Sequence, residues 1–333
     1  MSIKGKERFL NVLILIGVIG LLFIVGREQY KQSLPSHVRI GVDKSYSSIP
    51  FYVALEDTSR NYFALEKVEA EFIEIIGDPL QGIKEGLYDV VAVPWYSLLV
   101  SPSINGDTVK AFGGIELKSG RNLDALIVPA ETKIRRYSDI KKKRLGYISD
   151  TEYLVNLLLQ KMADDGITDV QRVVLQPEEV VTAFEEDKVD VMFLLDPYRG
   201  YMIYMGNPVL FEGLISYYLV PSFPYTAIVM RKEYAKKEDR LAAVRVKNAV
   251  EATLNYLSRN PEVAKKLLID MHGWAVEGAV VSAQIRTPEF YRLAEINVKN
   301  IEMYQTELVR MGIGTCGIRP TEFLFEKIDF LKK

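Results

Sequence analysis

The chain has 333 residues, of which 48% are hydrophobic and 26% are charged, so it can bury a large core and form two domains or one two-lobed unit. Its formal net charge is −2, and the only dense basic run, at 141–144, reads as solvated surface, which argues against nucleic acid as a partner. One cysteine excludes an intrachain disulfide and a Cys-x-x-Cys motif, and two distant histidines argue against a His/Cys metal cluster, so we expect no metal or cofactor.

A long apolar stretch lies close to the N-terminus. Residues 9–26, FLNVLILIGVIGLLFIVG, contain Asn11 as their only strongly polar side chain, and a helix of this length extends about 27 Å, close to the thickness of a bilayer core. A cleaved signal peptide is the alternative, but no small-residue cleavage site follows, and the first alanine of the chain is Ala54. We therefore expect residues 1–35 to be an uncleaved membrane anchor with its linker.

Basic residues indicate how this anchor is oriented. They precede the apolar stretch at Lys4, Lys6 and Arg8. Positive charge on the short side of a transmembrane helix stays in the cytoplasm. We expect a single-pass protein of the cell membrane with the bulk of its chain on the extracytoplasmic side.

Strand-like and helix-like segments then alternate. Strands are expected at 38–43, 68–76, 88–93, 108–115 and 123–130, and helices at 49–57 and 80–86. Pro50 suits the first turn of a helix, and Gly77-Asp78-Pro79 suits the start of another.

The alternation restarts after residue 143. Strands are expected at 144–148, 170–175, 189–195 and 225–232, and helices at 150–164 and 177–187. Ser149-Asp-Thr-Glu152 has the form of a capping box before the first of these helices. Repeated βα alternation predicts the α/β class with mostly parallel sheets.

The C-terminal third predicts helices at 239–259, 261–271 and 288–311 and no clear strand. His272, in DMHGW, is expected to cap or end a helix. The segment GIGTCG at 312–317 matches G-x-G-x-x-G, but it follows a helix instead of a strand, so we interpret it as a glycine helix stop.

Polar and aromatic residues follow four predicted strands, at 43–48, 94–97, 149–153 and 196–199. Any one of them is typical of ordinary turn and cap chemistry. Ligands of open parallel sheets bind beyond the carboxyl ends of the strands, so four such ends in two facing units predict one shared cleft. The predicted ligand-binding residues are Asp43, Tyr46, Ser47, Trp95, Tyr96, Ser149, Thr151, Tyr153, Asp196, Tyr198, Arg199 and Tyr225.

The expected cleft is aromatic and acidic, with Lys44 and Arg199 as its only basic residues. Nitrate or a sulfonate requires charge-assisted donors, which helix N-termini replace only in part. Aromatic faces with acids suit a flat heterocycle or an amine. Asp150 and Glu152 are equally suited to helix capping, so the solute stays open.

The order and spacing of these segments resemble the extracytoplasmic solute-binding proteins of ABC importers, of the nitrate/sulfonate/taurine and thiamine-precursor type (NMT1/THI5-like). The similar segments are RIGVDKSYSSIPFYVALED, GIKEGLYDVVAV, YSDIKKKRLGYISDTEYLVNLLLQKMADDGI, VVLQPEEVVTAFEEDKVDVMFLLDPY and VEATLNYLSRNPEVAKKLL, within residues 36–325. Most members carry a cleavable signal or a lipid-bearing cysteine, and this chain has neither pattern.

The resemblance implies a type II periplasmic-binding-protein-like fold, in which two lobes joined only by two crossing strands close on a small solute. Lobe 1 would comprise 36–126 and the helical part 225–333, and lobe 2 would comprise 127–224. The crossings would be LDALIVPA (123–130) and PSFPYTAIVM (221–230).

Three functions remain open at this point. The first is a receptor that delivers a small organic solute, heterocyclic or amine-bearing, to the permease and ATPase subunits of an ABC importer, or a sensory relative of it. The second is an enzyme similar to thiamine-pyrimidine synthases, but no cysteine cluster is present, and both histidines are expected outside the cleft. The third is a membrane-anchored structural protein. We expect a non-enzymatic receptor.

Overall fold

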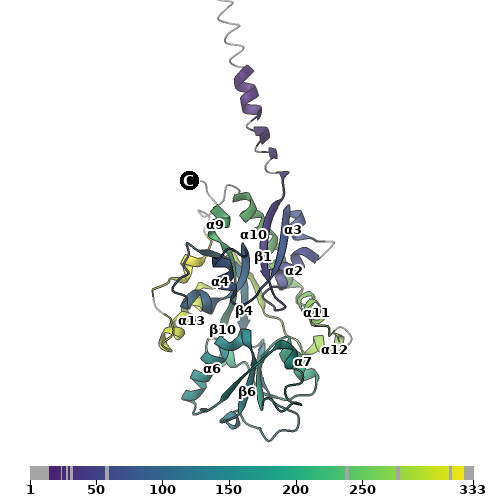
Figure 1. Cartoon of the computed structure of the whole chain (residues 1–333), viewed down its shortest axis with the longest axis vertical. Coiled ribbons are helices and arrows are strands. Elements are labelled where there is room, and N and C mark those ends of the chain that lie inside the picture. Colours follow the sequence, from purple (N-terminus) through teal and green to yellow (C-terminus); the bar gives the residue numbers. More distant parts are fainter. Residues whose placement is uncertain are drawn as a thin grey trace, which may run out of the picture.

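The computed structural model describes residues 15–23, 25–27, 29–30, 33–56, 60–236, 240–274, 278–314 and 317–325. From residue 36 onward the chain forms two bodies, one above the other, each built around a β-sheet (Figure 1). Residues 15–23 form a helix that projects away from the upper body. The start of the expected anchor, residues 1–14, lies outside the described residues. Within the described part of the chain, no helix is both long and apolar enough to cross a bilayer.

Six strands form the sheet of the upper body. They are β1 (Ser36–Val42), β2 (Val68–Glu74), β3 (Val90–Pro94), β4 (Val109–Lys118), β10 (Ser222–Arg231) and β11 (Glu289–Arg292). Their order is β11-β4-β10-β3-β1-β2. Strand β1 pairs in parallel with β2 and β3, whereas β10 runs antiparallel to β3 and β4. The central strand β3, VVAVP, is buried on both faces, which explains its continuous apolar run.

Five strands form the sheet of the lower body. They are β5 (Asp124–Ile127), β6 (Arg144–Ile148), β7 (Gln171–Leu175), β8 (Val191–Leu195) and β9 (Val209–Glu212). Their order is β7-β6-β8-β5-β9, with β6 parallel to β7 and β8, and β5 antiparallel to β8 and β9. Both sheets are therefore mixed, so the expectation of mostly parallel sheets is corrected.

Helices cover the faces of both sheets. They are α2 (Ile49–Glu56), α3 (Tyr62–Leu65), α4 (Pro79–Lys84), α5 (Trp95–Val100), α6 (Glu152–Asp164), α7 (Tyr198–Tyr204), α8 (Leu214–Tyr218), α9 (Lys232–Lys236), α10 (Arg240–Arg259), α11 (Pro261–Met271), α12 (Gly278–Gln284) and α13 (Val298–Arg310). Helix α10 contacts α2, β1 and β11, and α13 contacts β10. Val246, Val250 and Leu254 of α10 are fully buried at helical spacing, as expected for a helix with one apolar face.

Two predicted helices differ from the structure. In the segment 177–187 only the 3₁₀-helix Pro177–Glu179 forms. The backbone hydrogen bonds after it do not keep the regular spacing of an α-helix, so the rest of the segment consists of turns. The segment 288–311 starts with strand β11, and its helix begins only at Val298. The side chain of Asn297 accepts a hydrogen bond from the Asn300 amide there, so Asn297 caps the later start. The glycine stop after this helix is confirmed by the positive φ of Gly312, 75°.

The chain passes between the two sheets at residues 119–123 and again at 213–221. These connections lie side by side, because the amide of Ser119 donates to the carbonyl of Pro221 at 2.7 Å. Strand β5 lies wholly in the lower sheet and β10 runs in the upper one. The expected crossing segments therefore lie largely within the sheets, and the passages are the loop 119–123 and the segment 213–221, which contains α8.

A third segment contacts both bodies, in addition to the two passages between the sheets. Helix α12 contacts both α11 of the upper body and α7 of the lower body before the chain returns to the upper sheet at β11. The Arg286 guanidinium donates to the carbonyl of Asn122 at 2.9 Å and to the carboxylate of Glu212 at 3.1 Å. Its side chain thus ties this segment to the lower body.

Close backbone approach in the upper sheet generates a first prediction. A Cβ atom on Gly114 of β4 would lie 2.2 Å from the carbonyl oxygen of Thr226 on β10. Since backbone must shift to admit it, we expect Gly114→Ala to lower the free energy of unfolding by at least about 2 kcal/mol in urea titrations. The control is Gly278→Ala, where the nearest atom is 3.6 Å away, and it should change stability by less than about 1 kcal/mol. Equal stability of the two variants would contradict this packing.

Candidate functional site

A cavity of about 850 Å³ lies between the two bodies. The residues that follow β1, β2 and β3 line it from the upper sheet, and those that follow β6, β7 and β8 line it from the lower sheet. These are the carboxyl ends of the strands that pair in parallel, where an α/β sheet usually binds its ligand. Four of these six strand ends were predicted from the sequence to line the cleft. Two more, Gly77-Asp78-Pro79 and Pro177-Glu178, carry the same turn signal and were missed.

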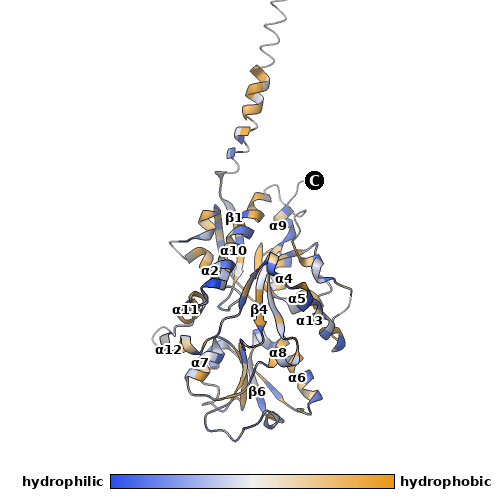
Figure 2. Cartoon of the chain, turned by 180° about the vertical axis from the view of Figure 1, so that it is seen from behind, coloured by the Kyte–Doolittle hydropathy of each residue, from blue (hydrophilic) through white to orange (hydrophobic). Residues whose placement is uncertain are grey.

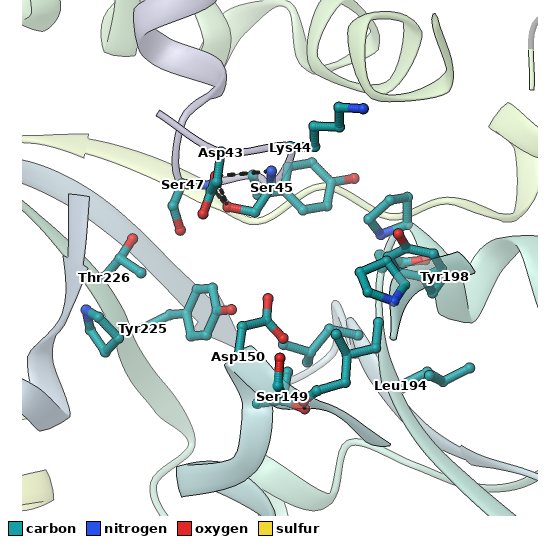
Figure 3. A pocket seen from close by; sticks show the side chains of 18 of the residues that line it. Asp43, Lys44, Ser45, Ser47, Ser149, Asp150, Leu194, Tyr198, Tyr225 and Thr226 are labelled. Carbon is teal, nitrogen blue, oxygen red and sulfur yellow. Dashed lines mark hydrogen bonds between the residues drawn. The ribbon is translucent and has the colours of Figure 1, made fainter. Parts of the chain in front are cut away.

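Nine predicted residues line the cavity: Asp43, Tyr46, Ser47, Ser149, Thr151, Tyr153, Asp196, Tyr198 and Tyr225. They come from both bodies and surround one space (Figure 3). Whether each of them contacts a solute stays a prediction.

Three predicted residues do not line this cavity, and each has another role. Trp95 is fully buried in the core and its Nε1 donates to the hydroxyl of Tyr291 at 3.0 Å. Tyr96 lies behind Tyr153, with ring centroids 4.9 Å apart in a stacked arrangement. Arg199 is 1% exposed and is held in ion pairs. We therefore revise the expectation that the Trp95 ring and the Arg199 guanidinium face the cleft.

The loop after β1 is shaped by Asp43. Its Oδ1 accepts hydrogen bonds from the amide and hydroxyl of Ser45, at 3.0 and 2.7 Å, and from the hydroxyl of Ser48 at 2.7 Å. The hydroxyl of Tyr46 donates to the carbonyl of Arg286 at 2.6 Å. These bonds hold the start of α2 in place and leave the serine-rich turn facing the cavity.

The turn after β6 differs from the predicted capping box. Residues Ser149–Thr151 form a 3₁₀ turn, and Thr151, without a side-chain cap bond, precedes α6. Asp150 is not used as a cap and extends into the cavity (Figure 3). Although Asp150 is exposed to solvent, partial desolvation of its carboxylate in the cavity, followed by the negative charge of Asp43, raises the pKa of Asp150 to about 6.

His272 lies in the cavity, which corrects the expectation that both histidines fall outside it. It forms the C-cap of α11, as predicted. Its Nε2 lies 3.2 Å from the carbonyl of Lys44, which requires the proton on Nε2, and its Nδ1 then accepts from the hydroxyl of Tyr198 at 3.4 Å. Its ring stacks on Trp274 at 4.8 Å. Burial lowers the pKa of His272, so the neutral form is favoured.

This aromatic contact connects the two bodies across the cleft. Tyr198 begins α7 of the lower body, and His272 ends α11 of the upper body. Trp274, which the sequence analysis did not select, also stacks on Tyr201 of α7 at 4.2 Å. The sequence DMHGW, an aromatic pair directly after a helix, was the available signal.

Among the described residues, two buried hydroxyl groups at the cavity have no hydrogen-bond partner. They belong to Tyr153 and to Thr226, which is 3% exposed. Buried polar groups are nearly always paired, so these two hydroxyls are exceptions within the wall of the cavity. Among the described residues no group of three His, Cys, Asp or Glu side chains is placed to hold a metal ion.

Asp196 organises the wall of the cavity formed by α7. Its carboxylate accepts hydrogen bonds from Arg199 Nε at 3.0 Å, from the amide of Gly200 at 2.9 Å and from the amide of Arg286 at 3.2 Å. Asp196 thus acts on the first turn of α7 through the amide of Gly200, although Pro197 occupies the N-cap position. Arg199 also donates to Glu212 at 3.2 Å and to the carbonyl of Gln284 at 3.0 Å.

Two sheets with a cavity between their strand ends define the periplasmic-binding-protein-like fold, and comparisons with known proteins agree. The family model described as NMT1/THI5 like matches residues 45–264, and the chain belongs to this family. No curated protein matches the chain.

Solved structures show the same fold at low sequence identity. The alkanesulfonate-binding protein SsuA from Xanthomonas axonopodis pv. citri, bound to MOPS, is 17% identical with a TM-score of 0.64, over 88% of this chain and 99% of that one. The periplasmic aliphatic sulphonate binding protein SsuA from Escherichia coli is 17% identical with a TM-score of 0.63, over 88% and 92%. The desulfurization enzyme DSZB is 10% identical with a TM-score of 0.61, over 88% and 97%. Binding proteins and an enzyme therefore share this architecture.

The contacts of Asp196 generate the second prediction. When its carboxylate is removed, Arg199 stays buried, and Glu212, which is more exposed, is its one remaining charged partner among the described residues. We expect Asp196→Ala to lower the free energy of unfolding by about 3–5 kcal/mol in urea titrations, instead of the smaller cost of a lost helix cap. Asp164→Ala, at the exposed end of α6, is the control and should cost less than about 0.5 kcal/mol. A loss below about 1 kcal/mol for Asp196→Ala would show that Arg199 does not depend on it.

Proposed function

We propose that this protein is a membrane-tethered solute-binding receptor of an ABC importer, which captures a small organic solute, heterocyclic or amine-bearing, in the cavity between its two bodies. One observation carries the proposal: the ends of six strands from two sheets line a single cavity. Membership of the NMT1/THI5-like family supports it, as does the similarity of the fold to two sulfonate-binding proteins.

The size and lining of the cavity support a small solute. A volume of about 850 Å³ falls within the range typical of small-molecule sites, which combine apolar walls with a few polar groups. Aromatic side chains, among them Tyr153, Tyr198 and Tyr225, supply the walls, and the hydroxyls of Ser47 and Thr226 supply polar contacts.

We further propose that lobe 1 comprises the upper sheet with the C-terminal helices and that lobe 2 comprises the lower sheet. The lobes move as hinged bodies about 119–123 and 213–221, which revises the expected boundaries at 126 and 224. Solute enters between them and is held when they close. Permease and ATPase subunits of the importer would then receive it.

The anchor remains part of the proposal. The helix at residues 15–23 exposes apolar side chains on all sides, for example Leu21 at 65% and Phe23 at 72%, and is coloured as hydrophobic in Figure 2. A helix that exposes apolar side chains all round is better suited to lipid than to water. The bulk of the chain would lie on the extracytoplasmic side.

Solute-dependent stabilisation tests this function. The full chain, purified in mild detergent, is heated with small metabolites that include anions, neutral heterocycles and amines. A solute at 100 times its dissociation constant should add about 2.7 kcal/mol to the free energy of unfolding. If no compound from any of these classes raises the melting temperature, the receptor function is wrong.

The third prediction uses two variants to test whether the solute binds in the cavity. Tyr198→Ala should leave the fold intact and weaken binding of the stabilising solute by about 1–3 kcal/mol, because a ring at the cavity wall is lost. Trp95→Phe is the matched aromatic control. It should reduce stability, since the hydroxyl of Tyr291 loses its donor, and leave the affinity unchanged. The reverse pattern, measured by calorimetry, would place the solute elsewhere.

The fourth prediction concerns the anchor. We expect the mature protein to retain residues 1–26 and to stay with the membrane fraction after a high-salt wash, because a hydrophobic span is not released by screening charges. N-terminal sequencing and fractionation check this together. A soluble protein whose first residue is near Leu34 would show that the segment is a cleaved signal.

A further inference from the structure

The charged side chains that line the cavity are strongly unbalanced. Those among the described residues are Asp43, Asp78, Asp150, Glu178 and Asp196 on the negative side and Lys44 on the positive side. Within the part of the chain that the structure describes, no arginine belongs to this lining. In Figure 3 the side chain of Lys44 extends along the upper rim and its amino group points away from Asp150. The open space of the cavity therefore faces more negative than positive charge.

Protein contacts account for several of these carboxylates. Asp196 is paired with Arg199 at 3.0 Å, and Asp78 caps α4 by accepting from the amide of Leu80 at 2.9 Å. Oδ1 of Asp43 accepts three hydrogen bonds within its own turn. These groups already have the donors that a charged oxygen requires.

Asp150 differs from them. In the described part of the chain it has no ion pair, and its only donors are amides of its own turn. Its carboxylate points into the open space between the loop of Asp43 above and the ring of Tyr225 beside it (Figure 3). Asp43 comes from the upper sheet and Asp150 from the lower one, so closing the cleft brings two like charges together. A positive charge placed between them would remove this repulsion.

Aromatic rings surround the same position. Burial, followed by the charge of Asp150, raises the pKa of Tyr225 and of Tyr198, as expected when a carboxylate lies near both phenols. The negative face of a tyrosine ring attracts an ammonium group, and the attraction increases away from bulk water. The unpartnered hydroxyl of Thr226, itself 97% buried, lies at the same cavity as a further acceptor.

We propose that the cavity binds an organic cation, an aromatic or apolar molecule with one ammonium group, whose positive charge lies between Asp150 and Asp43 and whose apolar part lies against Tyr198 and Tyr225. This inference rests on the proposed function and names the class of its solute. It separates this chain from its sulfonate-binding neighbours, since an anion would meet Asp150 without an arginine to neutralise it.

The binding of a cation is linked to protons. Asp150 has a pKa of about 6 in the free protein, so the carboxylate is ionised above that pH and largely neutral below it. A bound ammonium group favours the ionised form and lowers this pKa. Affinity is therefore highest above pH 7 and falls as the pH drops through 6, and binding near pH 6 releases protons.

Three probes of similar shape test the inference: 2-phenylethylamine, 2-phenylethanol and 2-phenylethanesulfonate. The full chain is titrated with each by calorimetry at pH 7.5. We expect the amine to bind at least about tenfold more tightly than the alcohol, and the sulfonate to bind most weakly. At pH 6, heats in two buffers of different ionisation enthalpy should reveal proton release with the amine only.

Asp150→Asn is the fifth prediction and the decisive variant. It keeps the shape of the side chain and removes the charge, so the dissociation constant for the amine should rise about 10- to 100-fold, and the proton release should disappear. Asp164→Asn, at the far end of α6 and away from the cavity, should bind like the natural chain. Thermal unfolding of both variants confirms that they are folded.

The outcomes separate the solute class from the receptor function. Tighter binding of the sulfonate, or amine affinity unchanged by Asp150→Asn, overturns the cation inference and leaves the receptor function in place. If none of the three probes binds at 10 mM, the cation inference is overturned as well. The receptor function then stands or falls by the wider set of metabolites, in which neutral heterocycles and other anions are included.

Discussion

The buried ion pair between Arg199 and Asp196 fixes the position of α7, which forms one wall of the cavity. Arg199 is 1% exposed, and it joins α7 to β9 through Glu212 and to α12 through the carbonyl of Gln284. Asp196 also accepts a hydrogen bond from the amide of Arg286, which belongs to the segment that returns to the upper sheet. A buried ion pair of this kind adds little net stability, but the loss of one partner is costly. Its effect is to fix three chain segments in one arrangement, and this arrangement presents Tyr198 to the cavity.

The same contacts constrain motion between the two bodies. With only two connections, the bodies could rotate freely about 119–123 and 213–221. Helix α12 packs on α11 and α7 at once, and the rings of His272 and Trp274 contact Tyr198. An opening movement must separate these rings or carry α12 with the lower body, so we expect opening to be larger on the side of the cleft away from α12.

Most strands and the positions of their ends could be predicted from the sequence, because buried strands such as β3 and β8 are short apolar runs followed directly by polar turns. Elements and side chains whose positions depend on tertiary contacts could not be predicted in this way. Strand β11 has four residues and forms through pairing with β4, a contact that no local pattern contains. Trp95 was placed in the cleft because it follows a strand, yet its ring turns into the core toward Tyr291. His272 enters the cavity only because α11 ends beside the loop of Lys44, which depends on tertiary packing.

Tryptophan fluorescence tests most directly whether the cavity is the solute site. The chain has two tryptophans, Trp95 in the core and Trp274 at the cavity, so Trp95→Phe leaves a single reporter that stacks on His272. Titration of this variant with 2-phenylethylamine should give a saturable change in emission, with the dissociation constant found by calorimetry. The account would be contradicted if the amine gave binding heat without changing the emission of Trp274 in Trp95→Phe, while the emission of Trp95 did change in the Trp274→Phe variant.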